Sequence, residues 1–178
     1  MKLLIEEFKI NSTGKQQEAG FLLSRIGEFS AEYLLDILEK SQNRAERSQI
    51  LRLMPDLGSA ALPALTERLN RGGTWFYLRN LILILGKIGT ENEVGILAHL
   101  LSHEDFRVRQ EALNSIYAIG GKYRGDILLS AFASADETTK GVIADMLGAL
   151  RYENAAPVFL EILGAKSLFL RKSVIASR

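Results

Sequence analysis

Two histidines near the middle of the chain have the side chains and the spacing of a metal-binding pair. His99 and His103 are four residues apart, and histidines at this spacing can bind zinc together when both lie on one helical face. Glu104 and Asp105 follow directly as possible oxygen ligands. However, a helix should end near Leu101, and no further ligand is identifiable. We therefore interpret the second histidine and its acidic neighbours as a solvated loop and expect no metal site.

The motifs of other common chemistries are missing from the sequence. The chain contains no cysteine, which removes thiolate metal ligands, disulfide bonds and cysteine nucleophiles. It has no phosphate-binding loop, dinucleotide-binding glycine pattern, nucleophile elbow or pair of catalytic carboxylates. Gly72 and Gly73 are best explained as a turn between helices. We therefore expect a protein that is not an enzyme and that needs no cofactor.

All these side chains are positioned by helices that recur in a tandem repeat of constant length. Helix-capping residues recur at one strict spacing, at Ser12, Asn43, Thr74, Asp105, Asp136 and Ser167. Fifteen residues after each of the first four caps stands a glycine, at Gly27, Gly58, Gly89 and Gly120. Glycine most readily adopts the left-handed turn that follows a helix. Arg151 occupies the fifth glycine position, where we expect an irregular junction.

Apolar residues between these marks predict two helices in each repeat. The second, called helix B, has an apolar stripe four and eight residues before the glycine position, and a shorter helix A precedes it. These columns read Leu23, Met54, Leu85, Ile116 and Leu147; Ala19, Ile50, Leu81, Ala112 and Ile143; and, in helix A, Leu3, Leu34, Leu65, Ile96, Ile127 and Val158. Pro55 lacks an N–H donor, so helix B of the second unit should kink or end early there.

The repeat resembles HEAT repeats, and most closely the short bacterial variety that includes the phycobilin-lyase type. The matching segments are residues 108–113 running to Ile119 and Gly120, and residues 78–81 running to residues 86–89. The resemblance implies an all-α chain that forms a right-handed alpha-alpha superhelix, a HEAT-like solenoid of about six helix pairs. It covers nearly the whole chain as one array over residues 1–178, with units at about 1–27, 28–58, 59–89, 90–120, 121–151 and 152–178.

The sequence also makes predictions for the two ends of the array. Residues 1–10 are a plausible first helix A, and residues 168–178 should be a helix B that stops before its closing turn. A solenoid needs polar caps on its terminal repeats, yet the last helix still offers Phe169, Leu170, Val174 and Ile175. We therefore expect the array to be truncated at its C-terminus. With no stretch near the ~20 apolar residues of a membrane span, we also expect a cytoplasmic protein without a membrane partner.

The repeat register predicts a partner-binding surface. In HEAT-like stacks the B helices line the concave face, and their outward columns here are mostly polar. The third unit departs from this with Phe76 and Leu83 around Arg79. With their neighbours they form the predicted surface, which consists of Arg52, Phe76, Arg79, Leu83, Arg107, Gln110 and Asn114. An apolar centre ringed by arginine and amide groups is typical of a binding hot spot. Alternatively, Phe76 and Leu83 pack against each other or under the preceding loop.

Trp75 and Tyr77 flank Phe76, and three consecutive helical residues cannot all face the core. The column of Trp75 also holds Phe106 and Leu168, and that of Tyr77 holds Val108 and Leu170. We therefore interpret Trp75 and Tyr77 as structural and expect Phe76 to be the most exposed of the three.

Charge is sorted between the expected faces. The B segments, from each cap to the glycine position, carry 14 basic and 8 acidic residues, or +6, whereas the rest carries 8 basic and 13 acidic residues, or −5. A basic face would attract an acidic peptide or a phosphate backbone. Alternatively, several of these cations belong to a structural ladder. That column contains Arg47, Arg109, Lys140 and Arg171, with the pairs Asp105–Arg109 and Asp136–Lys140.

These patterns favour a non-catalytic protein–protein interaction scaffold that binds an acidic or amphipathic segment on its concave face. Two other classes stay open. The first is a nucleic-acid-binding protein similar to the HEAT-like alkylation-repair glycosylases, although those carry tryptophans and an acid in the groove. Here Asp145 is the only acid in the outward columns, and the chain has one tryptophan. The second is a phycobilin-lyase-like protein, which the repeat type permits but no single residue supports.

Overall fold

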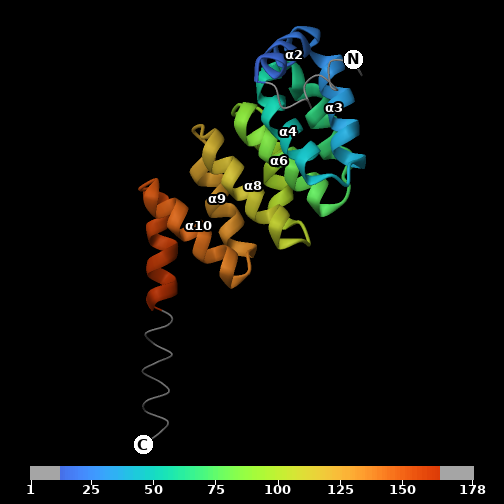
Figure 1. The fold of residues 1–178 in the computed structure, drawn as a ribbon. Coiled ribbons are helices and arrows are strands. Elements are labelled where there is room, and N and C mark those ends of the chain that lie inside the picture. The colour runs from blue at the N-terminus through green and yellow to red at the C-terminus, as the bar shows by residue number, and fades with distance from the viewer. Residues whose placement is uncertain (1–12, 165–178) are drawn as a thin grey trace, which may run out of the picture. The chain divides into compact units, whose positions relative to one another are not determined.

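The computed structural model describes residues 13–164, and every regular element in that range is helical (Figure 1). The α-helices are α2 (Thr13–Ile26), α3 (Glu28–Lys40), α4 (Arg44–Leu53), α5 (Leu62–Arg71), α6 (Trp75–Ile88), α7 (Val94–His99), α8 (Phe106–Ile119), α9 (Arg124–Ser134) and α10 (Glu137–Ala149). Three 3-10 segments span Met54–Ala61, Leu100–Ser102 and Glu153–Ala155, and residues 156–164 are again helical. The prediction of an all-α chain is confirmed for this range.

Two helices fall in each repeat period of the described residues. Helices α3 and α4 are helix A and helix B of one period, and α5–α6, α7–α8 and α9–α10 are the next three pairs. Helix α2 has the place of the first helix B, and the helix at 156–164 that of the last helix A. The chain divides into two compact units, Met1–Arg124 and Gly125–Arg178. The expected caps Ser12 and Ser167 and the expected helices at 1–10 and 168–178 lie outside the described residues.

The predicted caps begin the B helices. Asn43, Asp105 and Asp136 are the N-caps of α4, α8 and α10, and a side-chain oxygen of each accepts a first-turn N–H at 2.9, 2.8 and 2.9 Å. Thr74 occupies the N-cap position of α6, but its side chain accepts no helix N–H. Pro55 acts as predicted, because α4 ends at Leu53 and the chain continues as a 3-10 segment.

The glycines after the B helices follow the prediction at three positions out of four. Gly27, Gly58 and Gly120 have positive φ angles of 68°, 56° and 83°. At Gly89 the prediction is wrong, because its φ is −69° and the chain leaves α6 in an extended conformation. The next turn is instead held by Glu93, whose carboxylate accepts the N–H of Thr90 at 2.7 Å. No left-handed residue is therefore needed there.

Arg151 adopts the left-handed conformation that its column requires, with a φ of 50°. Its N–H donates to the Gly148 carbonyl at 3.0 Å, and the N–H of Tyr152 donates to the Leu147 carbonyl at 3.0 Å. These two bonds form a Schellman motif, the closure that usually contains glycine. The expectation of an irregular junction is therefore wrong: the backbone closes α10 regularly and strains Arg151 instead.

The core follows the predicted columns of the B helices. Every described side chain four or eight residues before the glycine position is buried, and these are Leu23, Met54, Leu85, Ile116, Leu147, Ile50, Leu81, Ala112 and Ile143. Helices α6 and α8 lie side by side and approach closely at Gly86 (Figure 1). A Cβ added there would lie 2.4 Å from Ser115 Oγ, which donates to the Ile82 carbonyl at 3.1 Å.

Replacement of Gly86 by alanine should lower the free energy of unfolding by about 1–3 kcal/mol, because the added methyl group forces α6 and α8 apart. Gly95 in α7 is a matched control, since a Cβ there would meet nothing within 4 Å. Gly95→Ala should be neutral or stabilising by up to about 1 kcal/mol through helix propensity. Urea unfolding of both variants measures the difference, and equal effects would contradict the close approach.

Replacement of Arg151 by glycine should raise the free energy of unfolding by about 0.5–1 kcal/mol. The gain comes from relief of the left-handed strain, partly offset by the greater freedom of glycine in the unfolded chain. Arg151→Ala removes the same charge but keeps a Cβ, so it should bring no gain. If thermal or urea unfolding showed equal gains for both variants, charge removal and not backbone strain would be the cause.

Candidate functional site

The predicted surface residues lie on three B helices of the unit Met1–Arg124. Arg52 is on α4, three residues are on α6, and the remaining three are on α8. None of the seven is buried: Arg52, Arg79, Arg107 and Asn114 are exposed, and Phe76, Leu83 and Gln110 are half-buried. The predicted outward register of the B helices is therefore confirmed at these positions.

Arg79 is held in place by a buried carboxylate on the neighbouring helix. Its Nε donates to Oε2 of Glu111 at 3.1 Å, which joins α6 to α8. Glu111 is only 9% exposed, whereas the Arg79 side chain is 50% exposed. A buried carboxylate is costly unless a cation neutralises it, so Arg79 supports the fold as well as the surface. The terminal nitrogens of Arg79 donate no hydrogen bond to another described residue.

Trp75 is part of the surface, contrary to the sequence interpretation. The guanidinium carbon of Arg107 lies 3.3 Å from the centroid of the Trp75 ring, and the ring meets Phe76 edge-on at 5.9 Å. Trp75 is 36% exposed, Phe76 is half-buried and Tyr77 is fully buried. The prediction that Trp75 is structural and Phe76 the most exposed is therefore wrong. Trp75 is the first residue of α6, where no earlier helical turn covers its ring.

Arg107 is also paired with the cap of its own helix. Its Nε and Nη2 donate to the two carboxylate oxygens of Asp105, at 3.0 and 2.7 Å. These hydrogen bonds, together with the backbone N–H of Arg107 and the nearby His103, lower the pKa of Asp105 from 3.8 to about 2. The pair fixes the guanidinium against the tryptophan ring, so that the cation and the aromatic ring form one rigid feature.

Two arginines at the same repeat position have a structural role. Arg47 donates to the carbonyl of Ser41 at 2.8 Å, and Arg109 donates to the carbonyl of His103 at 2.8 Å. Each bond ties the first turn of a helix B to the loop two residues before its cap. This agrees with the alternative that part of the basic column is structural, but the predicted pairs are wrong, because Asp105 pairs with Arg107 and Lys140 pairs with Glu137. Among the cations of the predicted surface, Arg52 makes no ion pair with a described residue.

A second ladder, missed by the sequence analysis, joins successive A helices. Arg68 on α5 contacts Asp36 at 2.6 Å and Glu39 at 3.2 Å on α3, and Arg71 contacts Glu39 at 2.8 Å. These partners are 29–32 residues apart, close to one repeat length, as are Arg79 and Glu111. Opposite charges about one repeat length apart in the sequence are the signal that would have identified both the ion pairs between α3 and α5 and the Arg79–Glu111 pair.

The histidines do not form a metal centre in the described range. Nδ1 of His103 accepts the N–H of Asp105 at 3.0 Å and so orders the loop before α8. His99 is exposed at the end of α7. Nowhere in residues 13–164 do three or more His, Asp or Glu side chains gather as a metal site would require. Nor does this range contain a helix that combines the length and the apolar character of a membrane span.

Comparison with known proteins identifies the repeat. The family model described as HEAT repeats matches residues 31–116, which run from α3 to α8. Residues 31–116 are HEAT repeats. This HEAT segment contains all seven predicted surface residues, the Arg79–Glu111 pair and the Trp75–Arg107 stack. No curated protein matches the chain at a significant level.

Arg79→Glu should destabilise the HEAT segment by about 1–2 kcal/mol, because it sets a second carboxylate against buried Glu111. The figure lies below that for a fully buried pair because water screens the half-exposed arginine. Arg52→Glu, at an exposed position without an ion-pair partner among the described residues, should change the free energy of unfolding by less than about 0.5 kcal/mol. Equal losses in urea unfolding would show that Arg79 does not neutralise Glu111.

Acid should remove the contribution of Asp105 to stability. Because the folded state lowers its pKa to about 2, the contribution is fully present above the usual pKa of 3.8 and is lost as the pH falls toward 2. Asp105→Asn keeps a capping oxygen but removes the charge. The difference in thermal midpoint between wild type and Asp105→Asn should therefore be constant above about pH 5 and shrink between pH 4 and 2. In an Arg107→Ala background most of this pH dependence should vanish; its persistence would exclude Arg107 as the cause.

Proposed function

We propose that this chain is a non-catalytic protein–protein interaction scaffold that binds an acidic or amphipathic segment of another protein across α4, α6 and α8. HEAT repeats typically serve as protein-interaction scaffolds, and the matched segment contains the whole surface. The surface combines exposed arginines with half-buried apolar side chains, as expected from a protein-binding site.

The geometry of Arg79 is the observation that carries this proposal. Glu111 holds the guanidinium through Nε alone, so both terminal amino groups remain available to a carboxylate of the partner. An arginine that is already held in place loses less conformational entropy on binding than a free one. Phe76 and Leu83 lie on the same helix as Arg79 and are half-buried. A partner bound over them would shield the Arg79–Glu111 ion pair from water.

The Trp75–Arg107 stack extends the surface that we propose. Tryptophan and arginine are the side chains most often found at the energetic centre of interfaces. The stack is rigid because Asp105 accepts hydrogen bonds from Nε and Nη2 of the same guanidinium. An amphipathic partner would place an apolar side chain against the tryptophan and an acidic side chain near Arg79 or Arg52.

The contacts of the basic side chains give nucleic-acid binding less support. Arg79, Arg107 and Lys140 each have a carboxylate partner, and Arg47 and Arg109 bind loop carbonyls. The charge of +6 on the B segments therefore overstates the cations that are free to contact phosphate. No observation favours the phycobilin-lyase-like alternative.

The proposal also includes the architecture that the spacing of the tandem repeat implies. It places one right-handed superhelix of about six helix pairs over residues 1–178, in a cytoplasmic protein, with the surface on its concave side. The four helix pairs and two single helices of the described residues support the number of repeats. Small-angle X-ray scattering of the whole chain would test this elongated shape.

A selection from phage-displayed random peptides tests the binding mode. Peptides selected on the whole chain should be enriched in Asp or Glu beside large apolar residues. Arg79→Lys keeps the charge that neutralises Glu111 but loses the planar fork, so these peptides should bind it about tenfold more weakly. Arg71→Lys is a matched control, because Arg71 is 48% exposed and also pairs with a carboxylate, but lies on helix A.

Equal binding of the selected peptides to both variants would exclude the α6 surface. A separate titration of labelled duplex DNA at about 50 and 200 mM salt tests the alternative. Tight binding that collapses between these concentrations would replace the scaffold proposal with phosphate recognition.

A further inference from the structure

The loop before α8 is closed by the side chain of His103. Its Nδ1 accepts the N–H of Asp105 at 3.0 Å, and its carbonyl oxygen accepts Nη1 of Arg109 at 2.8 Å. The residue is half-buried. An imidazole nitrogen accepts a hydrogen bond only while it carries no proton. The bond that ties the loop to the cap of α8 therefore exists only while Nδ1 of this histidine is unprotonated.

The chain builds the same loop before α4 with a side chain that carries no charge. Ser41 stands two repeats before His103, and its Oγ accepts the N–H of Asn43, the cap of α4, at 3.1 Å. Arg47 donates to the Ser41 carbonyl at 2.8 Å, as Arg109 does at His103. The position two residues before the cap thus holds a side-chain acceptor in both loops, and only the one before α8 titrates.

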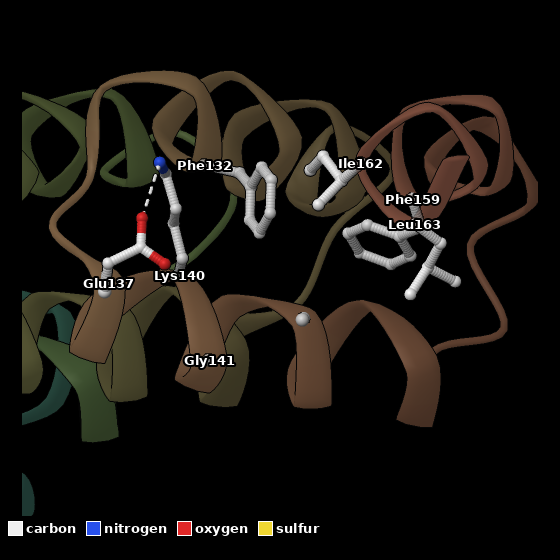
Figure 2. A pocket seen from close by; sticks show the side chains of 8 residues that line it. Phe132, Glu137, Lys140, Gly141, Phe159, Ile162 and Leu163 are labelled. Carbon is white, nitrogen blue, oxygen red and sulfur yellow. Dashed lines mark hydrogen bonds and ion pairs between the residues drawn. The ribbon is translucent and has the colours of Figure 1, made fainter. Parts of the chain in front are cut away.

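The corresponding column of α10 shows that the repeat does not require this arrangement. Lys140 stands one repeat after Arg109. Figure 2 shows it beside Glu137 of its own helix, and its Nζ lies 3.2 Å from the Glu137 carboxylate. The bonds at His103 and Ser41 are therefore properties of these two loops and do not follow from the repeat alone.

The loop at His103 leads directly to the stack of Trp75 and Arg107. Asp105, whose N–H is bonded to His103, accepts the backbone N–H, Nε and Nη2 of Arg107 at 2.8, 3.0 and 2.7 Å. The guanidinium of Arg107 lies in turn on the Trp75 ring. A displacement of Asp105 therefore moves the cation that covers the tryptophan.

The charged groups around His103 do not change charge in the range where an imidazole does. Hydrogen bonds from Arg107, followed by smaller contributions that include the charge of His103, lower the pKa of Asp105 to about 2. Besides Asp105, the charged or titratable side chains at this end of the packed helices α6, α7 and α8 are Glu104 in the loop, Arg107 and Arg109 on α8, Arg79 on α6 and His99 on α7. Carboxylates and guanidinium groups ordinarily keep their charge between about pH 5 and 8. In this described region the two histidines alone are of a type that titrates there.

We propose that His103 is a pH switch for the part of the partner-binding surface formed by Trp75 and Arg107. While the ring is neutral, it accepts the N–H of Asp105 and keeps the cap in place. Once Nδ1 is protonated, its N–H faces another N–H, so the bond is lost and Asp105 moves together with Arg107. The stack is thus assembled at neutral pH and loosened in acid. This inference concerns the regulation of the proposed surface and rests on the proposed function.

The fluorescence of Trp75, the single tryptophan of the chain, tests the switch without a partner. Its emission should change in one sigmoidal step between about pH 8 and 5, as Arg107 leaves the ring. His103→Ser should abolish the step, because serine is the acceptor that the chain itself uses at residue 41. His99→Ser is the matched control and should keep the step, because His99 is exposed at the end of α7.

Two outcomes of this titration would overturn the proposal: no step in the wild type, or a step that persists in His103→Ser. If His103→Ser altered the emission already at about pH 8, His103→Asn would take its place. An asparagine amide oxygen accepts the N–H two residues further on and carries no proton that titrates between about pH 5 and 8.

Binding of the peptides selected at neutral pH measures the functional consequence. Their Kd for the wild type should rise at least about fivefold from about pH 7.5 to 5.5, and that for His103→Ser less than about twofold. The carboxylates of the peptides stay ionised, because their usual pKa values are about 4. Equal weakening in both proteins would overturn the switch. A fluorescence step that depends on His103, in a chain that selects no peptide, would support the switch and remove the proposed function.

Discussion

The close approach of α6 and α8 organises the HEAT segment. Neither helix of a repeat can bury its apolar stripe alone, so each repeat is stable only against the next. Gly86 has no side chain, which lets Ser115 reach the carbonyl of Ile82 and brings Glu111 within reach of Arg79. The interaction that closes the core therefore also places the main cation of the candidate surface.

Arginine has two distinct roles in this fold. Arg47 and Arg109 satisfy carbonyl groups in the loops before their helices, so their charges are committed to the backbone. Arg79 is anchored at one nitrogen and remains half exposed, and Arg52 has no ion-pair partner among the described residues. The net charge of a helical face is therefore a poor guide to what the face binds. The positions of the buried carboxylates decide which cations remain available.

Much of the fold could be predicted because the signals are local. The caps at Asn43 and Asp105 bind N–H groups two or three residues away, and Pro55 ends its helix through its own missing donor. The buried columns follow from helical periodicity. The left-handed turns at Gly27 and Gly120 also depend only on the residue itself. These local signals predict the repeat, its helices and the outward register of all seven candidate residues.

Which outward residues combine into a site depends on contacts between helices that are far apart in the sequence. Glu111 is 32 residues from Arg79, and no local pattern shows that its carboxylate is buried against that arginine. The exposure of Trp75 depends on Arg107 of the next repeat, and the extended backbone at Gly89 depends on the loop that follows. These features arise from contacts across one repeat length. The burial of side chains and the pairing of charges between helices depend on how neighbouring repeats pack. The sequence of a single repeat does not contain this information.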